Sequence, residues 1–303
     1  MKLKRIKRCI VSKNLKILRA FIDAIRVVNG DIFVSVAYRK GRAFCRYDGD
    51  FNLKYRVEEE CLSGMGFGDY RGFAVDEEGN FILTGLHNGE NVVSLFRLDK
   101  NGKVAYTTYI NDIGLLESMA IDSKRNLYLH SPLKEAPVYR YSNDLSEVKP
   151  VGEFPSERDG VSGRIAQIAI DKEDNLIVVY ETSPAIIQKY SPQGKCIFEK
   201  IFEPADESID LLSQVLDFTI NPDNNNLYVL LNELDKRGRP VKILNPDGDE
   251  EDRFFLPSCT RRIHITKNDI LYSSGTIFGL PGILLSWGIY GAITLIDKYR
   301  LQG

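Results

Sequence analysis

A short pattern recurs along this chain: an apolar run, an Asp or Asn, a polar turn and a second apolar run. Residues 73–83 read FAVDEEGNFIL, and later copies read MAIDSKRNLYL, IAIDKEDNLIV and FTINPDNNNLYV, with looser copies near residues 25 and 263. The turn residues lie 45 to 50 positions apart, at Asp76, Asp122, Asp171, Asn221 and Thr266. Strand-length apolar runs bounded by Asp, Asn and Gly turns are typical of antiparallel hairpins. The pattern therefore predicts a repeated all-β structure.

A second marker follows the first in every repeat, usually a basic residue and a Tyr just before another turn. Its six copies begin at Arg46, Arg97, Arg140, Lys189, Ile243 and Lys298. A period of roughly 40–50 residues with four strands per repeat predicts propeller blades. The expected fold is thus an all-β, six-bladed β-propeller in one domain, with blades near residues 24–60, 70–111, 117–154, 165–203, 216–256 and 262–303.

The repeats resemble those of six-bladed propellers of the NHL type, which share the order of apolar strand, Asp, Gly or Asn turn, and second apolar strand. The resemblance extends from about residue 25 to the end of the chain and implies the fold. Such propellers serve as lyases, lactonases, ligand sensors and interaction platforms, so the resemblance leaves the function open.

The last repeat lacks a fourth strand, because residues 298–303 (KYRLQG) end at the turn that precedes this strand in the other repeats. Residues 4–11 (KRIKRCIV) are predicted to supply it and to close the ring from the other end of the chain. The first 22 residues hold eight basic residues and no acidic one. A basic outer edge discourages edge-to-edge pairing. The alternative is a basic segment that binds a membrane or a partner.

Composition and motifs exclude several classes of protein. The five cysteines are scattered without a C-x-x-C pair, which argues against a disulfide framework or a zinc site and predicts a reducing, cytoplasmic location. A net charge of −2 gives no overall attraction to nucleic acid, and no such partner is expected. The sequence contains no nucleophile elbow, phosphate-binding loop or H-E-x-x-H motif.

The candidate site is the ring of residues that enters the first strand of each repeat, because in propellers these residues surround the mouth of the central channel. The predicted ligand-binding residues are Asp23, Arg71, Glu117, Gln167, Asp217, Arg262 and His264. Lactonase-like propellers bind a divalent ion there, so the resemblance implies that Asp23, Glu117 and Asp217 converge on an ion such as Ca²⁺ or Mg²⁺. The arginines of the ring would instead pair these acids or favour an anionic ligand.

Two positions break a rule that the other repeats obey. His264 and Arg26 occupy a place that holds small residues elsewhere, namely Ala74, Ala120, Ala169 and Thr219. A polar side chain at such a place needs a hydrogen-bonding partner or water. His264 is expected to be a structural histidine with a satisfied hydrogen bond, and its role in the ligand-binding ring is the alternative.

Residues 270–296 contain no charged residue and are long enough to suggest a membrane-spanning helix. Pro281 and five glycines disfavour a helix, and both flanks are needed as strands of the last blade. Residues 275–291 are therefore predicted to form an apolar loop that covers the channel, contacts a partner or touches a membrane. The candidate contact residues are Phe278, Leu280, Leu284, Leu285, Trp287 and Tyr290.

The connections between repeats are long and varied, whereas the turns within them are short, so one face of the disc is expected to be rich in loops. Variable loops on a rigid scaffold commonly carry binding sites. The sequence favours a non-catalytic platform that binds a protein or a small ligand on this face, without a cofactor. The alternative is a metal-dependent lactonase or lyase at the channel mouth. Membrane association through residues 275–291 or the basic N-terminus is also considered.

Overall fold

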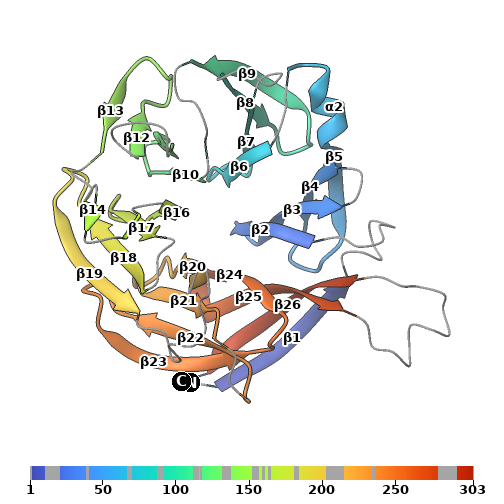
Figure 1. Cartoon of the computed structure of the whole chain (residues 1–303). Coiled ribbons are helices and arrows are strands. Elements are labelled where there is room, and N and C mark those ends of the chain that lie inside the picture. The colour runs from blue at the N-terminus through green and yellow to red at the C-terminus, as the bar shows by residue number, and fades with distance from the viewer. Residues whose placement is uncertain are drawn as a thin grey trace.

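The structure is a computed structural model. It describes residues 2–10, 21–38, 41–66, 70–86, 92–111, 116, 118–131, 138–151, 157–158, 161–162, 165–180, 184–202, 215–233, 236–278 and 292–302. These residues form six four-stranded antiparallel sheets arranged as blades around a central channel (Figure 1). The predicted fold class, an all-β six-bladed propeller, is confirmed.

The strands of each blade follow the chain from the channel outwards, except in the last blade. Blade one holds β2 (Phe21–Val28), β3 (Asp31–Tyr38), β4 (Gly41–Tyr47) and β5 (Leu53–Glu58). Blade two holds β6 (Tyr70–Val75), β7 (Phe81–Leu86), β8 (Val93–Leu98) and β9 (Val104–Ile110). Blade three holds β10 (Ser118–Ile121), β11 (Leu127–His130), β12 (Val138–Tyr141) and β13 (Val148–Pro150).

The second half of the ring repeats this arrangement. Blade four holds β16 (Ile165–Ile170), β17 (Leu176–Tyr180), β18 (Ala185–Tyr190) and β19 (Cys196–Phe202). Blade five holds β20 (Val215–Ile220), β21 (Leu227–Leu231), β22 (Arg239–Leu244) and β23 (Glu250–Leu256). Blade six holds β24 (Thr260–Thr266), β25 (Ile270–Phe278), β26 (Ala292–Gln302) and β1 (Lys2–Ile10). Short elements connect some blades: α2 (Glu59–Ser63), and the hairpin of β14 (Glu157–Arg158) and β15 (Val161–Ser162). The 3₁₀ turn η1 (Lys267–Asp269) lies inside blade six, between β24 and β25.

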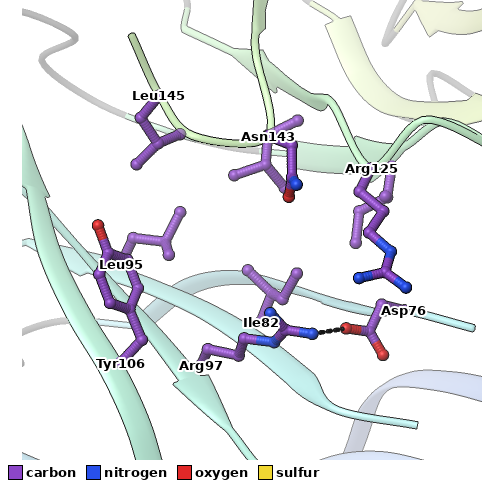
Figure 2. A pocket seen from close by; sticks show the side chains of 10 residues that line it. Asp76, Ile82, Leu95, Arg97, Tyr106, Arg125, Asn143 and Leu145 are labelled. Atoms are coloured by element: carbon purple, nitrogen blue, oxygen red, sulfur yellow. Dashed lines mark hydrogen bonds and ion pairs between the residues drawn. The ribbon is translucent and has the colours of Figure 1, made fainter. Parts of the chain in front are cut away.

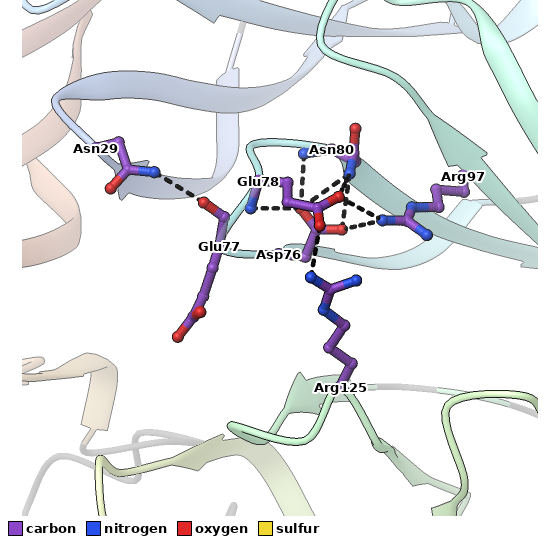
Figure 3. Close-up of polar contacts among 7 residues, drawn as sticks. All are labelled: Asn29, Asp76, Glu77, Glu78, Asn80, Arg97 and Arg125. Atoms are coloured by element: carbon purple, nitrogen blue, oxygen red, sulfur yellow. Dashed lines mark hydrogen bonds and ion pairs between the residues drawn. The ribbon is translucent and has the colours of Figure 1, made fainter.

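The recurring Asp holds the turn between the first two strands of a blade. The carboxylate of Asp76 accepts hydrogen bonds from the backbone N–H groups of Glu78 (3.0 Å) and Asn80 (2.9 Å). It also binds Arg97, the basic residue of the second sequence marker, with Nη2 at 2.7 Å from Oδ2 (Figure 3). Asp and Asn favour turns because their side chains bind backbone N–H groups in this way.

Blade four repeats this contact, since Lys189 Nζ lies 3.0 Å from Asp171 Oδ2 and both side chains are almost fully buried. The two markers found in the sequence are therefore bonded to each other in these blades, and the pair fixes the third strand against the first turn.

The apolar residues of neighbouring blades pack together and form the core between them. Phe33 of blade one meets Phe81 of blade two edge to face, with ring centroids 5.1 Å apart, and Phe44 and Phe96 lie in the same cluster. Each of these four side chains is fully buried, which stabilises the fold by roughly 1.5–3 kcal/mol per side chain. Because both faces of a blade are apolar, each blade needs a neighbour on either side.

The N-terminal strand closes the ring. β1 pairs with β26 in antiparallel register from Lys2 opposite Gln302 to Ile10 opposite Leu295, with an irregularity between Arg5 and Lys7. In Figure 1 this strand, in blue, lies beside the red C-terminal strand. The predicted closure is confirmed, and the observed strand begins and ends slightly earlier than residues 4–11.

The predicted apolar loop is shorter than expected. Residues 275–278 belong to β25, whose pairing with β26 continues to Phe278 opposite Ala292, so this part of the loop prediction is wrong. The uncharged sequence favours pairing there because Thr276, Ile277 and Ile293 are β-branched residues with high strand propensity. Residues 279–291, with Leu280, Leu284, Leu285, Trp287 and Tyr290, lie outside the described residues. No helix in the described part of the chain is long and apolar enough to cross a membrane.

Candidate functional site at the channel mouth

A cavity of about 360 Å³ opens where the innermost strands of the blades begin. Four of the predicted site residues, from blades one, four, five and six, line it: Asp23, Gln167, Asp217 and Arg262. Glu117 lies outside the described residues, and the structure describes only the backbone of Arg71. His264 lines a second cavity further along the channel. The structure therefore brings four of the seven predicted residues together at one mouth.

The two carboxylates of this mouth are already engaged by protein groups. Asp23 forms an ion pair with Arg42, whose Nη2 and Nε lie 2.8 and 2.9 Å from Oδ2. Asp217 is only 2% exposed; its Oδ1 accepts a hydrogen bond from Gln167 Nε2 (3.0 Å) and its Oδ2 one from the backbone N–H of Ile263 (2.8 Å). Asp217 therefore joins three consecutive blades.

These contacts fit a divalent cation poorly. Hard cations need several oxygen ligands that are free to bind, whereas Asp23 faces an arginine and both oxygens of Asp217 accept hydrogen bonds. In the described part of the chain, no three His, Cys, Asp or Glu side chains form a group that would hold a metal ion.

Within the described residues, Arg262 donates hydrogen bonds to backbone carbonyls and to no side chain. Its Nε donates to the carbonyl of Asp23, and its Nη1 donates to the carbonyls of Leu216 (2.9 Å) and Arg261 (3.2 Å). No carboxylate neutralises its charge within the described part of the chain. Arg262 thus links blade six to blades five and one and leaves a positive charge at the mouth.

Arg26 brings a second positive charge into the channel. A guanidinium has five N–H donors, but within the described residues its only hydrogen bond runs from Nη1 to the carbonyl of Ile25 (2.8 Å). The Cζ atom of Arg26 lies over the ring of Phe73, 5.8 Å from the ring centroid. Burial, as the largest cause, lowers the pKa of Arg26, while the nearby Asp217 opposes this effect. Arg26 therefore offers the cavity a part-buried cation, most of whose N–H donors have no partner among the described residues.

His264 is the next polar residue along the channel. Its Nε2 donates to the carbonyl of Val27 across the contact between blades six and one (3.2 Å). Burial and the neighbouring charge of Arg26 lower the pKa of His264 to about 3, so the ring is neutral at ordinary pH. The expected structural hydrogen bond of His264 is present. The two residues that break the small-residue rule therefore lie close together in the folded chain.

Sequence reasoning missed Tyr70, Met119 and Arg42. Tyr70 and Met119 line the cavity, and Arg42 stacks over the ring of Tyr70 at 4.0 Å from its centroid. Burial raises the pKa of Tyr70 to about 12. Tyr70 directly precedes the predicted Arg71, so widening the ring by one position would have found it. Arg42 comes from the third strand of its blade, and its contact with Asp23 depends on strand register.

A smaller pocket of about 70 Å³ lies between blades two and three (Figure 2). Arg97 and Tyr106 line it from blade two, Arg125 and Asn143 line it from blade three, and both arginines lie beside Asp76. Both arginines are ion-paired, Arg97 with Asp76 and Glu78 and Arg125 with Glu78. The pocket has room for a few water molecules and is not a candidate ligand site.

No protein-family model matches this sequence, and no curated protein matches it either. The fold is nevertheless similar to solved propellers. Virginiamycin B lyase from Staphylococcus aureus is 11% identical, with 100% of this chain and 90% of that chain covered and a TM-score of 0.55. A luciferin-regenerating enzyme is 10% identical over 100% of this chain and 96% of that chain, with a TM-score of 0.60.

The WD40 domain of Pan2 from Neurospora crassa is 8% identical over 99% of this chain and 96% of that chain, with a TM-score of 0.54. At these identities the likeness shows the propeller fold alone. The neighbours include proteins named as enzymes and a WD40 domain, and none of them assigns the chain to the NHL type.

Proposed function

We propose that this chain is a non-catalytic, NHL-like binding propeller whose channel mouth on the loop-rich face takes a small anionic ligand. The observation that carries the proposal is Arg26, a part-buried guanidinium that lines the cavity and makes one hydrogen bond, to a backbone carbonyl, within the described residues. Among the side chains that the structure describes, three arginines surround this mouth, Arg26, Arg42 and Arg262, against two aspartates, Asp23 and Asp217. The excess positive charge favours an anion.

The chemistry of the lining indicates the kind of ligand. A planar guanidinium binds carboxylate or phosphate oxygens through two parallel hydrogen bonds. Gln167 and Ser118 are further polar groups on the cavity wall, and Phe73 and Met119 provide apolar contact. A volume of about 360 Å³ lies in the range of small-molecule sites. A small carboxylate with a short carbon skeleton suits these features.

The metal-dependent lactonase or lyase is the weaker alternative. It would need free carboxylates at the mouth, and the contacts of Asp23 and Asp217 argue against this. We further propose that residues 275–291, including Phe278, and the basic N-terminus contact a protein partner or a membrane surface, and that the protein is cytoplasmic.

Thermal-shift and calorimetric titrations test the proposal with three probes: succinate, benzoate and inorganic phosphate. Succinamide, an uncharged analogue of succinate, serves as the control ligand. At least one anion should stabilise the protein, and Arg26→Met should weaken its binding about tenfold or more, since a charge-assisted pair of hydrogen bonds is lost. Arg253→Met, which removes an exposed arginine of blade five, should leave binding unchanged.

Equal binding of succinate and succinamide, or unchanged anion binding in a folded Arg26→Met variant, would contradict the proposal. The same assay with Ca²⁺, Mg²⁺ and Zn²⁺, together with metal analysis of the purified protein, tests the enzyme alternative. Stoichiometric metal that is lost in Asp217→Asn would favour that alternative.

A further inference from the structure

The opposite mouth of the channel holds a larger cavity, of about 820 Å³, on the face that carries the short turns. It lies between the first turn of blade six, residues 266–269, and the first turn of blade one, residues 28–30. The ends of the innermost strands contribute its apolar wall, with Val28, Ile220 and Ile270 half-buried. Its size suits a drug-sized organic ligand.

The cavity occurs where a regular feature of this face is missing. In the other five contacts between neighbouring blades, the first turn of one blade is bonded to that of the next. The pairs are Asn29 with Glu77, Glu78 with Arg125, Ser123 with Asp174, Lys172 with Asp223, and Asn221 with Asp269. Figure 3 shows the first two of these contacts. Among the described residues, no such bond joins blade six to blade one. The open contact leaves space for a ligand.

Two lysines line this cavity without a carboxylate partner among the described residues. Lys267 is exposed on the turn of blade six. Lys298 is half-buried; its Nζ lies 3.4 Å from the carbonyl of Gly49 and 5.5 Å from the ring centroid of Tyr272. Among the described residues of the lining, Glu77 alone is acidic, and its side chain points away from Arg97 and Arg125 (Figure 3). The lining therefore carries a small excess of positive charge.

The inner end of the cavity adds a neutral polar group. His264 lines it, uses Nε2 for the carbonyl of Val27 and stays uncharged because Arg26 and burial lower its pKa. An apolar wall, a tyrosine ring, and two ammonium groups that have no carboxylate partner among the described residues suit a ligand with an apolar body and a single negative charge. A polyanion fits less well because Glu77 would repel it.

We propose that the turn-face cavity between blades six and one is a second ligand site, separate from the channel mouth on the loop-rich face, and that it binds an amphipathic monoanion such as an aromatic carboxylate or sulfonate. Lys267 and Lys298 hold the anionic group, and the apolar wall contacts the body of the ligand.

The probe is 8-anilinonaphthalene-1-sulfonate, an aromatic monoanion whose fluorescence rises on binding. Titration at low and moderate salt should give one saturable site per chain. Lys267→Gln/Lys298→Gln should weaken binding about tenfold, since each exposed or half-exposed ion pair contributes up to about 1 kcal/mol. The matched control is Lys100→Gln/Lys124→Gln, which removes two lysines from turns outside this cavity. Glu77→Gln should tighten binding about two- to fivefold by removing the repulsion.

Val28→Trp should block binding by filling the cavity, and Arg26→Met should change it little, which separates this site from the proposed anion site. Circular dichroism and the unfolding midpoint confirm that each variant is folded. Non-saturable binding, or equal affinities for the two double-lysine variants together with no gain in Glu77→Gln, would overturn the proposal.

Discussion

The contacts between blades differ in how they are made at the inner strands. At two contacts within the ring, backbone N–H groups of one blade donate to side chains of the preceding blade: Ile168 of blade four to Ser118 (3.1 Å) and Ile263 of blade six to Asp217 (2.8 Å). Between blades six and one the direction is reversed. There the side chains of Arg262 and His264 donate to the carbonyls of Asp23 and Val27. Blade six thus reaches blade one through long side chains.

This difference has a cause in the repeat itself. Four repeats carry a small residue where blades one and six carry Arg26 and His264, and the last contact joins strands from opposite ends of the chain. Arg262 and His264 bridge that contact, and no bond between the first turns supports it among the described residues. Both proposed ligand sites include residues from the contact between blades six and one, where the sequence departs from the repeat.

Removal of β1 should have the largest effect. Deleting residues 1–10 strips the outer strand from blade six and exposes the edge of β26, which eight residue pairs now cover. We expect the free energy of unfolding to fall by several kcal/mol, a large share of the roughly 5–15 kcal/mol that is usual for folded proteins. Urea unfolding measures it, and a synthetic peptide of residues 1–10 should restore part of the stability.

A variant that changes side chains alone separates strand pairing from charge. Lys4→Gln/Arg5→Gln alters two exposed residues of β1 and should leave the free energy of unfolding within about 0.5 kcal/mol of the original. An unchanged midpoint after the deletion would show that the ring does not depend on its closing strand.

Loss of the Asp217 contact between blades four, five and six should lower the stability less than removal of β1. Asp217→Ala removes the acceptor for Gln167 and for the buried N–H of Ile263, and we expect a loss of about 2–4 kcal/mol in the free energy of unfolding. Asp217→Asn keeps one acceptor oxygen and should cost less. Equal stability of the Ala variant and the original protein would mean that Asp217 does not join the blades.

The smallest effect is the pH dependence of the closing contact. The pKa of His264 is about 3 in the folded protein, below the ordinary value of 6.5, so the unfolded chain takes up a proton first as the pH falls. This contribution to stability is complete above about pH 6.5 and is lost between pH 6.5 and 3, with a slope of at most about 1.4 kcal/mol per pH unit.

Urea unfolding of the original protein and of His264→Gln at pH 7.5, 6.5, 5.5 and 4.5 measures this contribution. The difference in the free energy of unfolding between the original protein and His264→Gln should change by about 1 kcal/mol between pH 7.5 and 5.5, and further at lower pH. A constant difference across the series would show that His264 titrates normally in the folded state.

The sequence predicts what depends on local chemistry. Asp76 and its equivalents can be recognised in the sequence because the turn that each one holds involves only the next four residues. A basic residue recurs at the position of Arg97, which binds Asp76 within the same blade. Comparison of the repeats also singled out Arg26 and His264. The pairing of Asp23 with Arg42 escaped notice because it depends on the register of strands in three dimensions.

The turn-face cavity escaped notice for a related reason. It lies where no bond joins the first turns of blades six and one among the described residues, and a missing contact leaves no pattern in a sequence. Residues 275–278 were expected in a loop because the uncharged sequence gives no sign of where the pairing between β25 and β26 ends.

The register of the closing strand also bears on how the molecule would respond to force. Lys2 lies directly opposite Gln302, so the two ends of β1 and β26 sit at the same end of one antiparallel pair. A pull applied to both ends would load the hydrogen bonds one after another, as in the opening of a zip, and not all at once as in shear. The ring would therefore be mechanically weak along this direction and would open first at its closing strand, however resistant it is to heat or denaturant.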